Sequence, residues 1–497
     1  MKRIVVIGSG LGGLSCGALL SRNGFQVTVL EQGLHVGGCL QCFVRRGNRF
    51  ETGMHFIGSA GKGQILDKLF RYLGIRDDLR LQALDADGYD VVSLGGEQFR
   101  FANGRDPFIQ QMSRYFPSQT DQLACYYDLV AQVARSSSMH SLCFDRGNAV
   151  LSTEYMLRSI NEVIDSVITD PLLARVLVGN LPLYAAERDK TPFATHAFVM
   201  DFYNQGAYRF VGGSDQLAHA LRRQIEAHGG EVLVNSKATR ILCDSMQATA
   251  VEVNGERLLP ADYVIAGIHP CRMLELLDTP ILRPSYRQRI QAIPNTISTF
   301  SLFLQFRPEA MPYMNHNLYA YHQPSPWGCE HYDESTWPKG YLYMHFCNEP
   351  NPRYAHSGVV LSYMQMDDVR QWQDTRVGHR GQAYEDFKHL KAERLLDALE
   401  KDMPGLRQAV AHYYTATPLT YRDYTGTEEG SLYGVAKDIH LGTAGRVSHR
   451  TKVPNLLLTG QNINSHGVLG VLVGTIVTCS DILGTQTVFN QIMEANQ

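Results

Sequence analysis

Three glycines near the amino terminus have the spacing that binds the phosphates of a dinucleotide. Gly8, Gly10 and Gly13 form a G-x-G-x-x-G pattern, and Glu31 follows 23 residues after Gly8. In such a pattern one glycine makes a tight turn, a second lets the backbone approach a pyrophosphate, and a third lets a helix pack closely on a strand. An acidic side chain at this interval can hold ribose hydroxyls, and it disfavours a 2′-phosphate. These residues therefore predict a dinucleotide other than NADP.

The elements around the glycines are those that the pattern requires. A β-branched run over residues 4–7 predicts a strand that leads into Gly8, residues 14–23 predict a helix that ends at Gly24, and residues 26–30 predict a second strand. The free N–H groups and partial positive charge at the start of the helix would face the phosphates. A glycine turn in an α/β domain without a ligand is the alternative.

A second group of glycines shows which dinucleotide to expect. Residues 37–39 read Gly-Gly-Cys, and residues 47–58 read GNRFETGMHFIG. The run from 8 to 58 resembles the FAD-dependent family of carotenoid desaturases, carotenoid isomerases and retinol saturases, and it is most similar to the retinol saturase branch. The resemblance implies FAD, which the glycine pattern alone does not distinguish from NAD.

The resemblance also implies a fold class, an α/β two-domain flavoprotein. A Rossmann-like FAD domain with a parallel sheet would comprise residues 1–60, 205–270 and 447–497, and an interleaved substrate domain with a mixed or antiparallel sheet plus helices would comprise residues 61–204 and 271–446. Alternation over residues 299–306 predicts a mostly antiparallel sheet with one buried face. The aromatic residues and methionines between 311 and 372 would line an apolar tunnel or form an ordinary core.

Cofactor-binding residues follow from the resemblance, position by position. They are Gly8, Gly10, Leu11, Gly12, Gly13, Glu31, Gln32, Gly37, Gly38, Thr52, Gly53, Met54, Ala238, Gly460, Gln461, Asn462, Gly467 and Val468. Residues 456–458 would form the last parallel strand. A helix that begins near Gly467 would direct its N-terminus at the N1–C2=O edge of the isoalloxazine, which becomes anionic when FAD is reduced. Many relatives carry an acid after Gly460, whereas this chain has Gln461 and Asn462, so a neutral hydrogen bond would replace a charged one.

Four side chains in motifs expected near the flavin are candidates to move a proton. They are His55, His466, Glu429 and Tyr433. Because FAD passes the hydride through N5, a reaction at an unactivated C=C bond needs an apolar channel and at most one proton donor or acceptor from the protein. The alternatives are a structural histidine at 55, a turn-setting histidine at 466, and loop residues at 429 and 433.

Composition excludes several other classes of protein. The chain has 497 residues, of which 44% are hydrophobic, and a net charge of −3, and its lysines and arginines are scattered, so no nucleic-acid partner is expected. Ten cysteines in a chain this long do not indicate a disulfide framework. Cys39 and Cys42 form a C-x-x-C, but zinc would need a second pair, and the other eight cysteines stand alone, so no metal site is predicted. A redox dithiol beside the flavin is the alternative, although it would require a second nucleotide fingerprint.

The expected partner is a hydrophobic small molecule, taken up through peripheral contact with a membrane. The expected location is the cytoplasm, because the thiols are compatible with a reducing compartment and no apolar run is long enough to span a bilayer. The electron donor or acceptor stays open, as does the choice between reduction, desaturation and isomerisation. Two other classes also stay open: a flavin amine oxidase, and a non-enzymatic binder of prenylated proteins, which would need no flavin.

Overall fold

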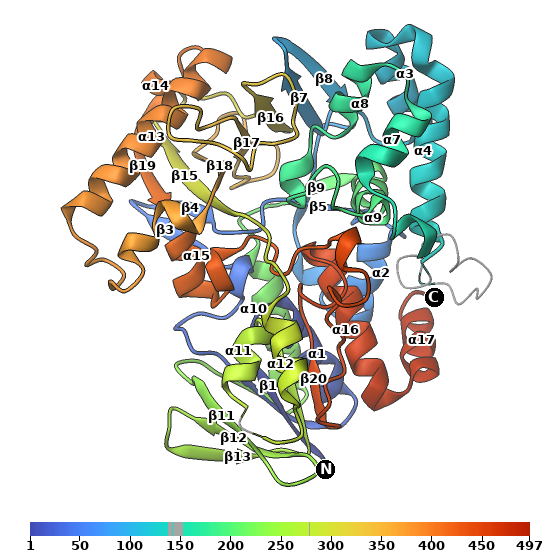
Figure 1. Cartoon of the computed structure of the whole chain (residues 1–497), viewed down its shortest axis with the longest axis vertical. Coiled ribbons are helices and arrows are strands. Elements are labelled where there is room, and N and C mark those ends of the chain that lie inside the picture. The colour runs from blue at the N-terminus through green and yellow to red at the C-terminus, as the bar shows by residue number, and fades with distance from the viewer. Residues whose placement is uncertain (138–141, 143–152, 278) are drawn as a thin grey trace.

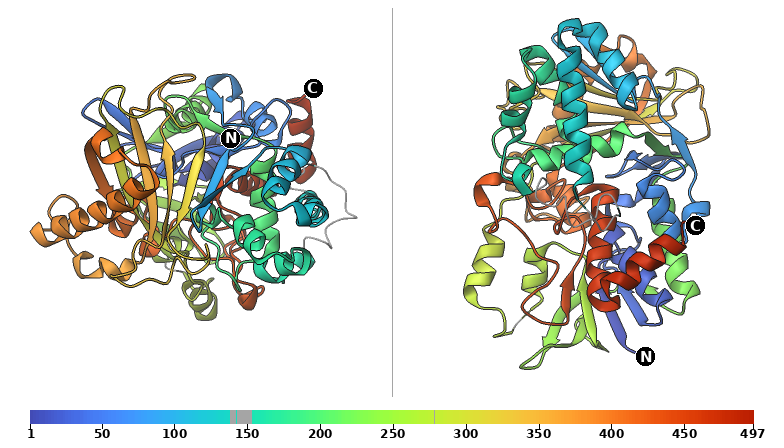
Figure 2. Two further views of the ribbon diagram at one scale, coloured as in Figure 1. Left: turned by 90° about the horizontal axis from the view of Figure 1, so that it is seen from above. Right: turned by 90° about the vertical axis from the view of Figure 1, so that its right-hand side faces the viewer.

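The computed structural model describes residues 1–137, 142, 153–277 and 279–497, and Cys143 therefore lies outside the described residues. It confirms the predicted α/β class, with one parallel sheet and one larger, mostly antiparallel sheet. Figure 1 shows the parallel sheet in the lower part of the molecule and the larger sheet in the upper part, and Figure 2 shows the same two regions from above and from the side.

The parallel sheet has the strand order β10-β2-β1-β14-β20. Its strands are β1 (Arg3–Ile7), β2 (Gln26–Leu30), β10 (Glu231–Leu233), β14 (Tyr263–Ala266) and β20 (Leu456–Leu458). In the register, Ile7 lies opposite both Leu30 and Ala266, and Ala266 lies opposite Leu458. The strands thus end at one edge, which is where α/β proteins bind their ligands.

Helices α1 (Leu11–Arg22), α10 (Asp215–Ala227), α16 (Gly467–Leu483) and α17 (Thr485–Glu494) belong to the same half of the molecule. Helix α1 begins at Leu11, three residues before the predicted start, and the chain turns at Gly24 with φ +82°. A Cβ atom at Gly17 would lie 2.9 Å from Ile225 Cδ1, so α1 and α10 are in close contact. The predicted last strand over 456–458 and the predicted helix from Gly467 are both confirmed.

The larger sheet has seven strands in the order β19-β15-β18-β17-β16-β7-β8. They are β7 (Asp90–Leu94), β8 (Glu97–Phe101), β15 (Ser298–Phe306), β16 (Asn317–Tyr321), β17 (Gly340–His345), β18 (Ser357–Met364) and β19 (Val410–Ala416). Only the pairing of β16 with β7 is parallel among these described strands.

The prediction of one buried face for this sheet is wrong. Phe300, Leu302 and Leu304 of β15 pack in a core with α13 (Gln382–Asp402), while Phe303 points to the opposite face and packs in the main core. Both faces of the strand are therefore covered, and its alternation reflects two different cores rather than core and solvent.

The remaining elements form smaller sheets and helical layers. The strands are β3 (Cys42–Arg45) with β4 (Asn48–Glu51); β5 (Ile57–Gly58), β9 (Ala207–Phe210) and β6 (Leu81–Ala83); and β11 (Ala238–Cys243), β12 (Ala248–Val253) and β13 (Arg257–Pro260). The helices are α2 (Ile65–Tyr72), α3 (Arg105–Tyr115), α4 (Thr120–Arg135), α7 (Ile160–Val167), α8 (Pro171–Leu177), α9 (Phe193–Asn204), α11 (Pro270–Glu275), α12 (Pro284–Gln291), α14 (Leu406–Ala409) and α15 (Pro418–Thr425). Short 3-10 helices are η1 (Gly38–Leu40), η2 (Arg76–Asp78), η3 (Pro117–Gln119), η4 (Leu181–Leu183), η5 (Met366–Asp368), η6 (Arg370–Trp372), η7 (Glu428–Gly430) and η8 (Ile439–Leu441).

None of the helices within the described ranges combines the length and the apolar character that crossing a bilayer requires. The division of the chain into an FAD-binding and a substrate-binding domain stays a prediction.

Candidate active site

The glycines that follow β1 have three different surroundings. Gly8 has φ +95°, a left-handed conformation that suits a tight turn. A Cβ atom at Gly13 would lie 2.0 Å from the Gly8 carbonyl oxygen, so only glycine lets α1 approach β1 this closely. At Gly10, by contrast, a Cβ would meet nothing within 4 Å. The open space at Gly10 is where a phosphate group could approach the backbone.

Helix α1 presents its first turn to this open space. Its N-cap residue is Gly10, which has no side chain to accept hydrogen bonds from the first N–H groups of the helix. The first turn carries no acidic side chain either. The orphan N–H groups and the positive end of the helix dipole together favour a phosphate. Gly37 lies beside the same loop, where its N–H donates to the Ser9 carbonyl at 2.9 Å, and a Cβ at Gly38 would lie 3.4 Å from Gly10 Cα.

Glu31 stands at the end of β2, at the same edge of the sheet. Its carboxylate accepts hydrogen bonds from the Ser9 hydroxyl at 2.5 Å and from the Gly33 N–H at 2.7 Å, and it is only partly buried. The next residue, Gln32, is exposed. The Glu31 carbonyl accepts from Ser236 N–H, two residues before Ala238, which is buried in β11. A carboxylate held in this way is suited to ribose hydroxyls.

The residues after β20 border the same open space on the side opposite Glu31. A Cβ at Gly12 of α1 would lie 2.8 Å from the Gly460 backbone nitrogen, so the helix and the strand end are in contact. Gly460 and Gly467 have φ +101° and +72°, and a Cβ at either would meet nothing within 4 Å. Val468, in the first turn of α16, is buried. With Gly10 these two glycines leave open space along the sheet edge that a flat, phosphate-bearing ligand such as FAD fits.

Asn462 makes one contact within the protein that the sequence did not indicate. The side chain is 6% exposed, and its Oδ1 accepts a hydrogen bond from Val435 N–H at 3.0 Å. This acceptor therefore holds the 434–435 turn. Gln461 is half-buried next to it.

The segment from Thr52 to His55 lies beside the double glycine. A Cβ at Gly53 would lie 3.1 Å from the Cβ of Cys39, the residue after Gly38. The Thr52 hydroxyl donates to the Gln41 carbonyl at 2.9 Å, and the Thr52 carbonyl accepts from the Tyr421 hydroxyl at 3.2 Å. Met54 is half-buried against the main core.

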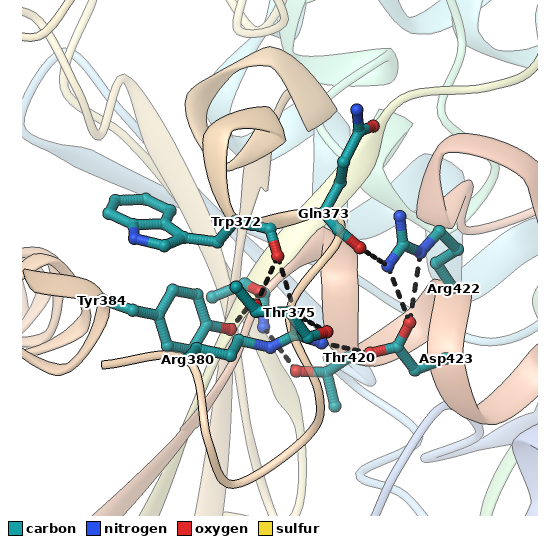
Figure 3. Close-up of polar contacts among 9 residues, drawn as sticks. Trp372, Gln373, Thr375, Arg380, Tyr384, Thr420, Arg422 and Asp423 are labelled. Atoms are coloured by element: carbon teal, nitrogen blue, oxygen red, sulfur yellow. Dashed lines mark hydrogen bonds and ion pairs between the residues drawn. The ribbon is translucent and has the colours of Figure 1, made fainter. Parts of the chain in front are cut away.

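An ion-pair network holds the helix that carries Tyr421. Figure 3 shows Asp423 of α15 between the guanidinium groups of Arg380 and Arg422. Arg380 also donates to the Trp372 carbonyl at 2.9 Å, and Arg422 donates to the Gln373 carbonyl at 2.7 Å. The 372–380 loop and α15 are thereby fixed to each other.

His55 pairs with a buried carboxylate that the sequence analysis did not single out. Its Nδ1 lies 3.7 Å from Glu51 Oε2, and both side chains are 7% exposed. Neither ring nitrogen of His55, nor Glu51 Oε1, has a hydrogen-bond partner among the described residues. Burial raises the pKa of Glu51, against the opposing effects of His55 and of Arg209. The pair can hold a proton away from solvent.

A small cavity adjoins this pair. Its lining includes Glu51 and His55 together with Phe303, Met344 and His345 of the larger sheet, and it has about 10 Å³ of free space. That is room for one water molecule. His345 is held by Tyr343 at 2.6 Å and by the Met314 N–H at 2.9 Å, and burial keeps its pKa far below the ordinary value. Among these groups, the unpartnered atoms of Glu51 and His55 are the natural ligands of such a water.

Tyr433 and His466 form a separate pair. Their ring centroids are 4.4 Å apart, and the Tyr433 hydroxyl donates to the Pro182 carbonyl at 2.9 Å. Burial, with Lys437 nearby, lowers the pKa of His466 to about 3, so the ring is neutral at physiological pH. His466 lines a cavity of about 50 Å³. A neutral imidazole can accept a hydrogen bond there, but it is a poor general acid.

Glu429 stands apart from the other three candidates. Its side chain is 60% exposed and lies 3.6 Å from Arg370 at the surface. The structure thus brings His55 together with Glu51, and Tyr433 together with His466, but it brings Glu429 to neither pair.

The raised pKa values of Cys39 and Cys42, the two thiols of the C-x-x-C, disfavour a role as a redox dithiol. Burial raises the pKa of Cys39 to about 11, and burial with Glu51 and Asp215 raises that of Cys42 to about 11. Both thiols therefore stay protonated at neutral pH, whereas thiol–disulfide exchange needs a thiolate.

Sequence reasoning missed two further groups. Arg209 is 1% exposed, donates to the His316 carbonyl at 2.7 Å, and has two unpartnered nitrogens among the described residues. His269, Cys271 and Glu428 come together as possible metal ligands. The sequence His269-Pro270-Cys271 could have indicated two of these three ligands, but the third, Glu428, is far away in the sequence.

Comparison with known proteins gives three kinds of similarity. A family model described as flavin containing amine oxidoreductase matches residues 11–467. The all-trans-retinol 13,14-reductase of Rattus norvegicus is 28% identical over 525 residues, covering 96% of this chain and 85% of that protein. Prolycopene isomerase 1, chloroplastic, of an Oncidium hybrid cultivar is 22% identical and covers 94% of this chain and 81% of that protein. An oxidoreductase from Methanosarcina mazei has a similar fold, with a TM-score of 0.63 at 15% identity over 96% of this chain and 100% of that one.

Proposed function

Because the chain belongs to the family of flavin-containing amine oxidoreductases and is an FAD-dependent oxidoreductase, we propose that it acts on a carbon–carbon double bond of a hydrophobic polyene, an isoprenoid or a related lipid. The observation that carries this proposal is the similarity to all-trans-retinol 13,14-reductase, which extends over 96% of the chain and so includes the regions that would select the substrate. The resemblance to prolycopene isomerase supports the same class of substrate.

The cofactor would lie along the edge where the parallel strands end. Gly10 and the first turn of α1 would receive the pyrophosphate, Glu31 would hold the ribose, and the N-terminus of α16 would face the flavin ring. When bound, FAD supplies hydride transfer through its N5 atom. The protein then has to exclude water, orient the carbon skeleton and manage one proton.

His55 is the side chain we assign to the proton. Its ring nitrogens are unpartnered within the described structure, it lies in a segment that contacts Cys39 beside the double glycine, and it adjoins residues of the larger sheet. Glu51 would position the imidazole. Tyr433 and His466 would shape the substrate space rather than transfer the proton, since His466 is neutral at physiological pH. Glu429 is left out because of its exposure.

We also propose peripheral contact with a membrane, because a polyene substrate is carried in a lipid phase. Co-sedimentation with lipid vesicles that contain the polyene tests this proposal. Protein that stays in the supernatant at every lipid concentration would contradict it.

The visible spectrum under anaerobic conditions tests the main proposal. The flavin band should bleach on chemical reduction and return when a polyene such as retinol or a carotenoid is added, and the product should be identified by mass spectrometry. Recovery with an amine-derived imine but with no polyene would instead support amine chemistry. A flavin band that stays bleached with every polyene, together with no change in the mass or geometry of any polyene on incubation with reduced or oxidised enzyme, would overturn the substrate class.

The reaction direction is read from the same experiment. A product with two additional hydrogens indicates reduction, a product with two fewer after incubation with oxidised enzyme indicates desaturation, and a product of unchanged mass with a different geometry indicates isomerisation.

A further inference from the structure

A cluster of three different donor atoms lies at the start of α11. His269, Cys271 and Glu428 place an imidazole nitrogen, a thiol sulfur and a carboxylate oxygen within 4.8 Å of one another. His269 and Cys271 are buried, and Glu428 is half-buried. These are the three donor types that zinc binds in proteins.

Two elements from distant parts of the chain hold the donors in place. His269 and Cys271 flank Pro270, the first residue of α11, which follows β14 after residues 267–269. Glu428 begins η7, which follows α15, the helix that the Arg380–Asp423 ion pair fixes in Figure 3. The positions of the donors are thus set by the backbone and by an independent ion pair.

The histidine is oriented as a metal ligand would be. Its Nε2 lies 2.9 Å from Asn295 Oδ1, an atom that can only accept, so Nε2 carries the hydrogen. Nδ1 then carries the lone pair of the ring and faces Cys271, whose backbone N–H it accepts at 3.3 Å as the N-cap of α11. A metal ion at Nδ1 would replace this one long hydrogen bond. A metal-bound histidine typically donates its other N–H to a neighbouring oxygen in this way.

The thiol is protonated while no metal is bound. Burial and then the charge of Glu428 raise the pKa of Cys271 to about 12. A cation between the sulfur and the carboxylate would reverse the second effect and displace the thiol proton. Binding of a divalent ion would therefore release one proton for each thiolate–metal bond that forms.

We propose that His269 Nδ1, Cys271 Sγ and the Glu428 carboxylate bind one divalent transition-metal ion, best matched by Zn²⁺, with water as the fourth ligand. The site is structural and does not depend on the substrate. It would brace the end of β14 beside the nucleotide loop, because a Cβ at Gly8 would lie only 3.0 Å from Ile268 Cγ2, next to His269.

Zinc titration of the FAD-loaded protein tests this site. After dialysis against a chelator and then metal-free buffer, Zn²⁺ is added in a calorimeter in two buffers with different heats of ionisation. We expect about one Zn²⁺ per chain and release of one proton, with a higher unfolding temperature for the zinc-loaded protein. Wild-type protein that binds no Zn²⁺, or binds it without releasing a proton, would overturn the proposal.

Two variants and a matched control identify the ligands. Cys271→Ser and Glu428→Gln should each weaken Zn²⁺ binding by at least about tenfold. Glu428→Gln is the safer variant, since the residue is half-buried and glutamine keeps its shape. Cys243→Ser, at a half-buried cysteine in β11, should bind as the wild type does. Unchanged binding by Glu428→Gln with intact flavin absorbance, or equal losses in Cys243→Ser and Cys271→Ser, would contradict this ligand set.

Discussion

The imidazole of His55 lies 3.7 Å from the Glu51 carboxylate, in a part of the molecule where each of the two side chains is only 7% exposed. A buried acid and base this close share protons as a unit. The arrangement therefore concerns both the chemistry of the site and the stability of the protein.

Replacing His55 by glutamine should remove the proton donor and leave the cofactor bound. We expect His55→Gln to slow polyene-dependent reoxidation of the reduced flavin by about 10² to 10⁴-fold, the usual contribution of a positioned acid or base. Stopped-flow absorbance at the flavin band measures this rate. His219→Gln, at an exposed position on α10, is the control, and a wild-type rate in His55→Gln would contradict the assignment.

Replacing Glu51 by glutamine should change how stability depends on pH. Burial raises the pKa of Glu51 above its ordinary value of 4.5, so between the two values the folded state holds a proton that the unfolded state has lost. The free energy of unfolding contributed by Glu51 therefore falls as pH rises above 4.5, by about 1.4 kcal/mol for each unit of the shift. Glu51→Gln lacks this loss.

Urea unfolding at about pH 5 and about pH 8 measures the effect. Glu51→Gln should gain stability relative to the wild type as pH rises, whereas Glu97→Gln, at an exposed position in β8, should follow the wild type at both values. A constant difference between Glu51→Gln and the wild type would mean that Glu51 titrates normally.

Two alanine variants in the glycine loop should separate cofactor binding from folding. Gly10 has φ −65° and open space at its Cα, so Gly10→Ala should fold normally, but its methyl group would occupy the space that a phosphate needs. We expect its FAD affinity to fall by about tenfold or more, a loss of at least about 1.4 kcal/mol. In Gly13→Ala the methyl group would be 2.0 Å from the Gly8 oxygen, so both FAD binding and stability should fall.

Fluorescence titration of the apoprotein with FAD and thermal unfolding measure the two quantities. Gly10→Ala that binds FAD with wild-type affinity would show that the phosphates lie elsewhere.

The ion pair of Arg380 with Asp423 should matter more than a surface pair. Both side chains are largely buried, at 4% and 19% exposure, so Asp423→Ala leaves a buried guanidinium without its counter-ion and should cost about 3 kcal/mol of unfolding free energy. Asp128→Ala breaks a pair with Arg105 in which the side chains are 56% and 45% exposed, and it should change the free energy of unfolding far less, because water screens an exposed ion pair. If urea unfolding shows the same loss of unfolding free energy in both variants, the buried ion pair contributes no more to stability than the surface pair does.

Local sequence signals predicted the nucleotide half of the molecule. The run before Gly8 and residues 456–458 are short and continuously apolar, which is typical of parallel strands buried on both faces, and the glycines mark their ends. Helices α7 and α8 are likewise separated by a local signal, because the Asp170 side chain caps α8 and Pro171 occupies its first turn.

Features that depend on long-range contacts were not predictable. The two covered faces of β15 result from α13, which lies far along the chain. Glu51 had no motif of its own, since its importance comes from burial beside His55. No local pattern indicated that the Asn462 Oδ1 accepts from Val435 N–H, and the role of Asn462 as a cofactor ligand stays a prediction. Side-chain partners of this kind are chosen by tertiary packing rather than by local pattern.

The order of the parallel sheet also bears on how the protein is synthesised. Four of its strands have been translated by Ala266, but the fifth, β20, begins only at Leu456, and Gly467 follows it. Until then, the nascent chain on the ribosome presents α1 without Gly460, which Gly12 contacts. We therefore expect the contact between α1 and Gly460 to form only after β20 has been translated, and a chain that ends upstream of Leu456 to lose FAD affinity.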